Sequence, residues 1–221
     1  VANKKYDGLI VTGAPLALID YEEVKYWETM TTILEWAQRH VNSTLYLCWA
    51  AHAAMYHFYG ITRELRDEKF SGVFKHKVND PNNELLRGFD PSFYAPHSRY
   101  GHIDTSLYNS VDGLNVVAES DEVGAYIVAS EDKRMVFVTG HPEYDADTLK
   151  AEYERDLQKS PDATKPENYF PDNDASKKPS KTWQSHAFLL FSNWLNYYVY
   201  QTTPYDINLV SQDVRTNNYA E

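Results

Sequence analysis

The sequence contains one cysteine among 221 residues. A single cysteine cannot form an internal disulfide, so a free thiol in a reducing compartment is the economical interpretation. No apolar run approaches the ~18 residues of a membrane span, and the amino terminus lacks a basic segment followed by an apolar one. These absences predict a cytoplasmic protein that has no membrane partner.

Nucleotide-binding loops are also absent, because neither a Gly-x-Gly-x-x-Gly nor a Walker motif occurs. The charge balance of 21 basic and 32 acidic residues gives a net charge of −11, which repels phosphate backbones, so nucleic acid is not an expected partner. His52 and His57 are five residues apart, which is not ligand spacing on a helix, and we predict no metal. The 18 tyrosines and five tryptophans are typical of core and subunit contacts, and we expect a homodimer.

The first part of the chain alternates between strand and helix patterns. The run DGLIVTGAP at 7–15 predicts a buried strand followed by a loop, and helical spacing begins at Glu22. STLYLC predicts a second strand, and WAAHAAMYHFYG predicts a helix for which Gly60 is a suitable C-terminal cap. The order strand, helix, strand, helix indicates an α/β fold with a mostly parallel sheet flanked by helices.

The rest of the chain has weaker patterns. Residues 61–110 predict loops and short strands, and three β-rich runs between 114 and 140 predict a meander. A helix is expected to end near Lys159, a surface loop or lid is expected over 160–181, and an aromatic helix should end at Pro204. With no internal repeat, residues 1–221 are expected to form a single domain.

The sequence around Cys48 carries the first chemical signal. A cysteine between a buried strand and the first turn of a helix lies where free backbone amides and the helix dipole favour a thiolate. The same amides, chiefly that of Trp49, are placed to hold the oxyanion of an acyl-transfer intermediate. A cysteine that packs as a small buried hydrophobic residue is the structural alternative on this stretch alone.

The sequence VTGHPEYD at 138–145 supplies the second signal. At strand spacing His141 and Glu143 share a face, so the carboxylate can orient the imidazole as in a catalytic triad. A histidine alone at a strand end is more often structural. However, parallel strands bring their carboxyl ends to one edge, so Cys48, His141 and Glu143 together predict a nucleophile, a base and its orienting partner.

Several motifs together resemble the homoserine O-acyltransferase family of methionine biosynthesis, commonly named homoserine O-succinyltransferase. They are TGAPL, LCWAAHAA, APHSRY, VTGHPEYDADTLKAEYERD, PENYFP and LLFSNWLNYYVYQTTPYD. The resemblance implies a class I glutamine amidotransferase-like (flavodoxin-like) fold. It also implies a ping-pong reaction in which an acyl group passes from acyl-CoA to a cysteine and then to a hydroxyl group. Acyl-CoA is then a co-substrate, and no other cofactor is expected.

The resemblance assigns roles residue by residue. Cys48 matches the acyl-thioester nucleophile, His141 the general base and Glu143 its partner, which coincides with the triad predicted from strand ends. Lys69 in DEKFSG and Ser98 in APHSRY match substrate contacts. The same resemblance also implies roles for Arg155 and Ala17.

Arg155 in EYERD matches the clamp for the substrate carboxylate, which a planar guanidinium can bind through two hydrogen bonds. Ala17 in TGAPLA matches a position that the family associates with donor choice, where glutamate accompanies acetyl transfer and glycine accompanies succinyl transfer. Alanine adds one methyl group and no charge, which favours succinyl. The structural alternatives are an exposed helix charge for Arg155 and a small loop residue for Ala17.

Other functions stay open at this point. Homoserine and serine differ by one methylene, so serine is an alternative acceptor. A cysteine hydrolase or glutaminase on the same scaffold, or a non-catalytic binding protein, is a further alternative. Family chains begin with a further segment that includes the first strand of the sheet, whereas this sequence starts close to TGAPL. We therefore expect residues 1–221 to lack that segment and to expose a sheet edge.

Overall fold

The computed structural model describes residues 4–16 and 18–204. Its strands form one sheet in the order β1-β2-β7-β6-β5-β3-β4. The strands are β1 (Tyr6–Val11), β2 (Val41–Leu47), β3 (Glu64–Val78), β4 (Ser92–His102), β5 (Leu114–Ser120), β6 (Gly124–Ser130) and β7 (Met135–Val138). The α-helices are α1 (Trp27–His40), α2 (Trp49–Tyr59), α3 (Thr105–Asn109), α4 (Thr148–Lys159) and α5 (Gln184–Asn193).

Short helical turns complete the fold. They are η1 (Tyr21–Glu23), η2 (Glu84–Leu86), η3 (Pro171–Asn173) and the π-helix η4 (Trp194–Tyr200), which continues α5. The predicted aromatic helix near the carboxyl end is therefore confirmed as α5 with η4. Within the described part of the chain, no helix has the length and apolar character needed to cross a membrane.

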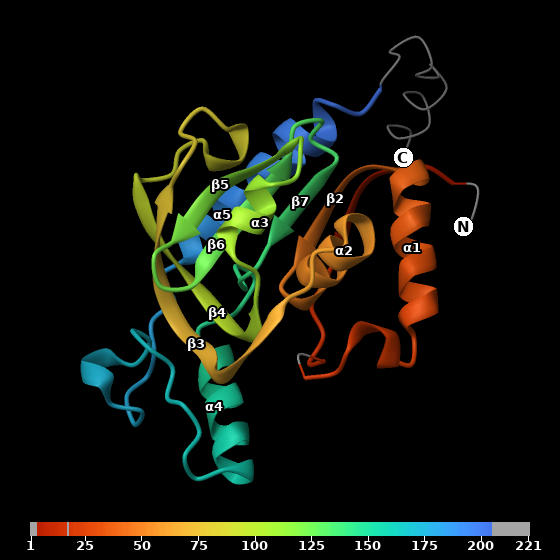
Figure 1. Cartoon of the computed structure of the whole chain (residues 1–221). Coiled ribbons are helices and arrows are strands. Elements are labelled where there is room, and N and C mark those ends of the chain that lie inside the picture. The colour runs from red at the N-terminus through yellow and green to blue at the C-terminus, as the bar shows by residue number, and fades with distance from the viewer. Residues whose placement is uncertain (1–3, 17, 205–221) are drawn as a thin grey trace, which may run out of the picture.

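Helices cover both faces of the sheet, as predicted for an α/β fold. Because side chains alternate along a strand, Tyr46 of β2 packs into a cluster with α1 and α2, whereas Leu45 and Leu47 pack against α5 and η4 on the other face. Figure 1 shows α1 and α2 together beside β2, and α4 projecting from the lower end of the molecule. Strand β2, which lies between β1 and β7, is thus buried on both faces of the sheet.

The prediction that most of the sheet is parallel is wrong. Only the β1–β2 and β2–β7 pairs are parallel, and the four remaining pairs are antiparallel. The predicted meander is present as β5–β6–β7. Residues 61–110, predicted as loops and short strands, instead contain the long antiparallel pair β3–β4. Charged residues on the exposed part of β3 and the register shift between Leu65 and Phe70 obscure its strand pattern.

The segment 160–181, predicted as a surface loop or lid, is held to the body of the protein. Glu167 forms a parallel bridge with Gly72 of β3, where Val73 N donates to Glu167 O at 2.8 Å. Tyr169 and Phe170 are buried in a cluster with Trp183. A surface segment with little regular structure is therefore fixed by a backbone bridge and two aromatic side chains.

We predict that Gly72→Ala destabilises the protein by about 3 kcal/mol or more, combining backbone strain with overpacking. Gly72 has a φ of +147°, and a Cβ atom there would collide with the backbone of Glu167. Gly113→Ala is the matched control, because its φ is +79° and nothing lies within 4 Å of the added carbon. The control should lose about 1 kcal/mol from strain alone. Urea unfolding measures the loss of stability in both variants. Equal losses would contradict the bridge between Gly72 and Glu167.

Candidate active site

Cys48 occupies a sharp turn between β2 and α2. Its φ of 48° and ψ of −113° are rare for a residue with a side chain, and its amide donates to Val138 O at 2.7 Å. Strain of this kind is held only where the surrounding structure fixes it, and it is common at functional sites. The alanine-rich α2 begins at the next residue and ends at Tyr59. Gly60, the predicted cap, follows it in the left-handed conformation.

His141 lies beside this turn because β2 and β7 are parallel and in register. Leu47 pairs with Val138, so the residues that follow both strands emerge at the same sheet edge. The predicted contact with the carboxylate is present, since His141 Nδ1 and Glu143 Oε1 are 2.7 Å apart. The pair is formed in a turn rather than along a strand, because β7 already ends at Val138.

The electrostatics of His141 favour an ion pair with Cys48. Burial disfavours the charged ring, but the negative charge of the Cys48 sulfur, the hydrogen bond with that sulfur and Glu143 together outweigh it. They raise the pKa of His141 well above its usual value. Tyr144 stacks on the imidazole with ring centroids 4.1 Å apart, which fixes the plane of the ring. The arrangement can hold a thiolate beside a protonated imidazole.

The triad opens into a cavity of about 900 Å³. The side chains at its wall come from the loop after β1, from α2, β3 and β4, from the turn after β7 and from α4. The charged or polar lining residues are Thr12, Cys48, His52, Arg63, Lys69, Ser98, Arg99, Tyr100, His141, Glu143, Tyr144, Glu152, Arg155, Asp156 and Lys159, and Trp49 is also part of the wall. This volume is of the size of small-ligand and cofactor sites.

The predicted substrate contacts Lys69, Ser98 and Arg155 all line this cavity, and two of them meet at Glu152. Lys69 Nζ lies 3.2 Å from Glu152 Oε2, and Ser98 Oγ donates to the same oxygen. Arg155 instead donates from Nε and Nη2 to Asp156 Oδ1, at 3.0 and 2.9 Å. The structure thus brings together residues from β3, β4 and α4.

Glu152 is a residue of the cavity wall that was not predicted from the sequence. Its carboxylate also accepts a 2.6 Å hydrogen bond from Tyr144. Burial alone would raise its pKa, but the charge of Lys69 and the hydrogen bonds from Ser98, Tyr144 and Lys69 lower it. Helical spacing is the signal that could have found it. Glu152, Arg155, Asp156 and Lys159 occupy positions i, i+3, i+4 and i+7, so they share one face of α4.

Trp49 and Ala17 are the remaining residues of the predicted site. Trp49 is the first residue of α2 and lies at the cavity wall, where the amides of a first helical turn have no acceptor within the helix. Ala17, predicted to influence donor choice, lies outside the described residues. No three His, Cys, Asp or Glu residues gather to hold a metal in the ranges that the structure describes.

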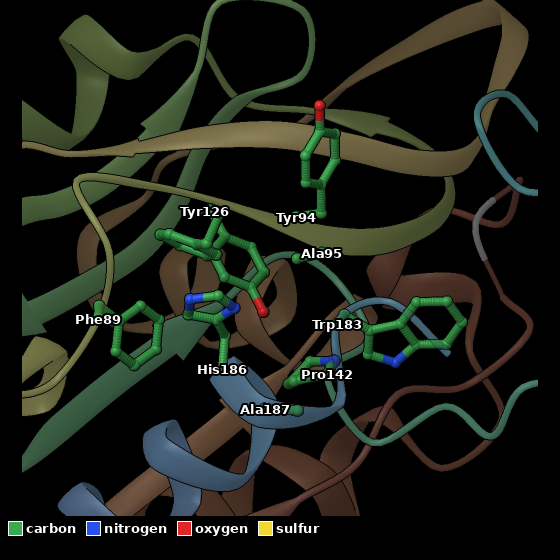
Figure 2. A pocket seen from close by; sticks show the side chains of 9 residues that line it. Phe89, Tyr94, Ala95, Tyr126, Pro142, Trp183, His186 and Ala187 are labelled. Carbon is green, nitrogen blue, oxygen red and sulfur yellow. The ribbon is translucent and has the colours of Figure 1, made fainter. Parts of the chain in front are cut away.

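A second hollow lies behind the turn that carries His141. Figure 2 shows Phe89, Tyr126, Trp183 and His186 around it, with Pro142 at its edge. It has no room for a water molecule. These aromatic side chains therefore act as packing that supports the turn between His141 and Glu143.

Comparison with known sequences identifies close relatives. The family model for homoserine O-succinyltransferase matches residues 1–205. The homoserine O-succinyltransferase of Alteromonas mediterranea is 84% identical over 96% of this chain and 68% of its own length. That of Pseudoalteromonas translucida is 65% identical over 100% of this chain and 70% of its own length. The chain therefore spans a little over two thirds of the length of these relatives.

Comparison with solved structures concerns the fold alone. A glutamine amidotransferase from Thermotoga maritima has a TM-score of 0.63 at 14% identity, covering 86% of this chain and 78% of that chain. A glutamine amidotransferase from Methylobacillus flagellatus has a TM-score of 0.62 at 14% identity, covering 86% and 76%. The predicted amidotransferase-like fold is confirmed.

We predict that Cys48→Ala lowers the titration midpoint of the His141 ring by about 1 to 3 pH units. Removing the sulfur removes the largest influence that opposes burial, so the neutral ring is favoured at lower pH. In the unaltered protein the ring should stay protonated through neutral pH. Histidine NMR titration measures the midpoint, and the surface variant Ser110→Ala is the control. An unchanged midpoint in Cys48→Ala would refute the ion pair.

Proposed function

The chain belongs to the homoserine O-succinyltransferase family, and we propose that it transfers an acyl group from acyl-CoA to the hydroxyl of homoserine through a thioester on Cys48. One observation carries the mechanism. A thiol at a strained strand-to-helix turn contacts a histidine that a carboxylate orients, at the wall of a cavity of about 900 Å³. The product ester belongs to methionine biosynthesis.

The first half-reaction forms the thioester. The Cys48 thiolate attacks the carbonyl carbon of acyl-CoA, and the carbonyl π pair moves to oxygen. The oxyanion then collapses, the bond to the CoA sulfur breaks, and His141 gives its proton to that sulfur. The amide of Trp49, in the first turn of α2, is placed to stabilise the oxyanion. Free CoA leaves, and His141 is left neutral.

The second half-reaction consumes the thioester. Neutral His141 takes the proton of the homoserine hydroxyl as its oxygen attacks the thioester carbon. The carbon–sulfur bond breaks, and the thiolate of Cys48 and the protonated His141 are restored. Glu143, 2.7 Å from Nδ1, keeps the proton on that nitrogen, so the other nitrogen performs both transfers.

The α4 wall suits an amino acid as acceptor. A free amino acid carries a carboxylate and an ammonium, and this wall offers both Arg155 and Glu152. The guanidinium of Arg155 can bind the carboxylate in place of Asp156, and Glu152 can accept from the ammonium. Ser98 and Lys69 then fix the position of Glu152. Serine differs from homoserine by one methylene, worth about 1 to 3 kcal/mol, so a competition assay between the two tests the acceptor.

We predict that acyl-CoA adds one acyl group to Cys48, visible by intact-mass measurement, and that Cys48→Ser abolishes the adduct. His141→Asn should slow both half-reactions by about 100-fold or more, and Glu143→Gln should slow them less. Release of CoA beyond one equivalent per protein only when homoserine is present supports transfer. Continued release beyond one equivalent without homoserine would instead indicate the hydrolase alternative, and equal rates in the unaltered protein and His141→Asn would remove the histidine from the mechanism.

We propose succinyl-CoA as the donor and predict that Ala17→Glu shifts the preference toward acetyl-CoA. A glutamate near the acyl group fills space and repels a succinyl carboxylate, whereas alanine does neither. Ala17→Gln is the matched control, because it fills similar space without charge. Initial rates with both donors measure the shift. A protein that prefers acetyl-CoA, or an unchanged preference in Ala17→Glu, would overturn the donor assignment.

A further inference from the structure

The active-site cavity is positively charged although the chain has a net charge of −11. Among the described residues that line it there are five cations and three carboxylates, an excess of two positive charges. The cations are Arg63, Lys69, Arg99, Arg155 and Lys159, and the carboxylates are Glu143, Glu152 and Asp156. A cavity charged against the sign of the whole chain favours an anionic ligand.

The charges are not evenly distributed around the wall. Glu152 and Asp156 pair with Lys69, Asp156 also pairs with Arg155, and Glu143 pairs with His141. The carboxylates that line the cavity therefore all have positive partners on α4, on β3 or in the turn after β7. The part of the wall around Gly101 holds two arginines, Arg63 and Arg99.

Arg99 is the more deeply buried of these two, with 4% of its surface exposed. It donates to the carbonyl oxygens of Gly101 and Val123 and, from Nε, to His97 Nδ1 at 3.3 Å. These partners are all neutral. The charge of the Cys48 sulfur favours this cation, but acylation removes that charge. A buried cation with only neutral contacts is costly, so a counter-charge from a ligand is then strongly favoured. Burial lowers the pKa of Arg99 only to about 10, so the guanidinium stays charged near neutral pH.

Arg63 packs against the same glycine. A Cβ atom on Gly101 would collide with Arg63 Cδ, so only glycine allows this approach. Its guanidinium donates to Ile19 O at 2.8 Å and lies 4.2 Å from the centre of the Tyr21 ring. Arg63 is 7% exposed and belongs to the cavity wall. Two buried guanidinium groups thus flank one backbone position.

His52 completes this wall. It lies one helical turn beyond Cys48, whose carbonyl accepts from His52 N at 3.2 Å. The ring is 3% exposed, and its Nε2 has no hydrogen-bond partner among the described residues. Burial, Arg99 and Arg63 hold the pKa of His52 well below its usual value, so the ring is neutral and adds a polar donor rather than a third charge.

We propose that Arg63, Arg99 and His52 form a subsite for the distal carboxylate of a dicarboxylic acyl group carried on Cys48. This inference rests on the proposed acyl transfer and names the part of the protein that selects the donor. One helical turn spans ~6 Å, which suits a four-carbon acyl chain that runs from the sulfur toward this wall. Acetyl has no distal charge and gains nothing from the subsite.

The test compares succinyl-CoA and acetyl-CoA in the acylation of Cys48, without acceptor, in the intact protein. Arg63→Gln should lower the ratio of succinyl to acetyl acylation rates about tenfold to a hundredfold, as expected for loss of one charged hydrogen bond. Arg63→Lys keeps the charge but lacks the planar guanidinium that binds a carboxylate through two hydrogen bonds. It should lower the ratio less than Arg63→Gln does. Arg87→Gln is the matched control, because Arg87 is exposed and lies over the Tyr197 ring, 5.5 Å from its centre. In this control the ratio of succinyl to acetyl acylation rates should be unchanged.

Arg63 also holds the loop after β1, so a second variant protects the test against misfolding. His52→Leu keeps a buried side chain of similar size but removes the polar ring, and it should also lower the ratio. Equal loss with both donors in Arg63→Gln and His52→Leu would show a structural role and overturn the subsite.

Two further outcomes separate this inference from the proposed function. A raised KM for homoserine, with an unchanged donor ratio, would place the acceptor carboxylate at this wall and overturn the donor subsite. If the unaltered protein forms no adduct with either donor, the proposed acyl transfer itself fails, and the subsite fails with it. An adduct with a donor ratio that the variants lower supports both.

Discussion

The parallel pairing of β2 with β7 is the constraint on which the active site depends. Leu47 pairs with Val138, and the amide of Cys48 donates to the Val138 carbonyl at 2.7 Å. This hydrogen bond continues the ladder one residue beyond β2 and holds the strained turn at Cys48. A slip of one residue would turn every side chain of β2 to the other face, so the packing that buries β2 also fixes the distance between thiol and imidazole.

Burial disfavours the charged ring of both histidines in this site, and the neighbouring charges decide which of them is protonated. At His141 the low-dielectric surroundings oppose the charged ring, yet the sulfur and Glu143 supply enough negative charge to keep it protonated. At His52 the neighbouring charges are the arginines Arg99 and Arg63, which add to burial and keep the ring neutral. Two histidines within one cavity thus take different protonation states because of the sign of their neighbours.

The residues that sequence alone could place are those whose position follows from local pattern. Cys48 and His141 each follow an apolar strand, and the ends of parallel strands meet whatever the rest of the sheet does. Arg99 and Arg63 were missed because their burial depends on contacts between β4, the loop after β1 and Gly101, which no local period encodes. The pair β3–β4 was missed for a related reason, since its pairing is long-range and half of β3 is exposed.

The proposed donor subsite depends on the loop after β1 as well as on the wall around Gly101. Arg63 donates to the carbonyl oxygens of Leu16 and Ile19, which flank position 17 in the sequence. A side-chain change in this loop therefore acts on the guanidinium as well as on the acyl group, and a change at Arg63 releases the loop. Residues that share a partner in this way have non-additive effects. The contribution of position 17 to donor choice accordingly depends on the residue at position 63, and a double-mutant cycle is the measure of that coupling.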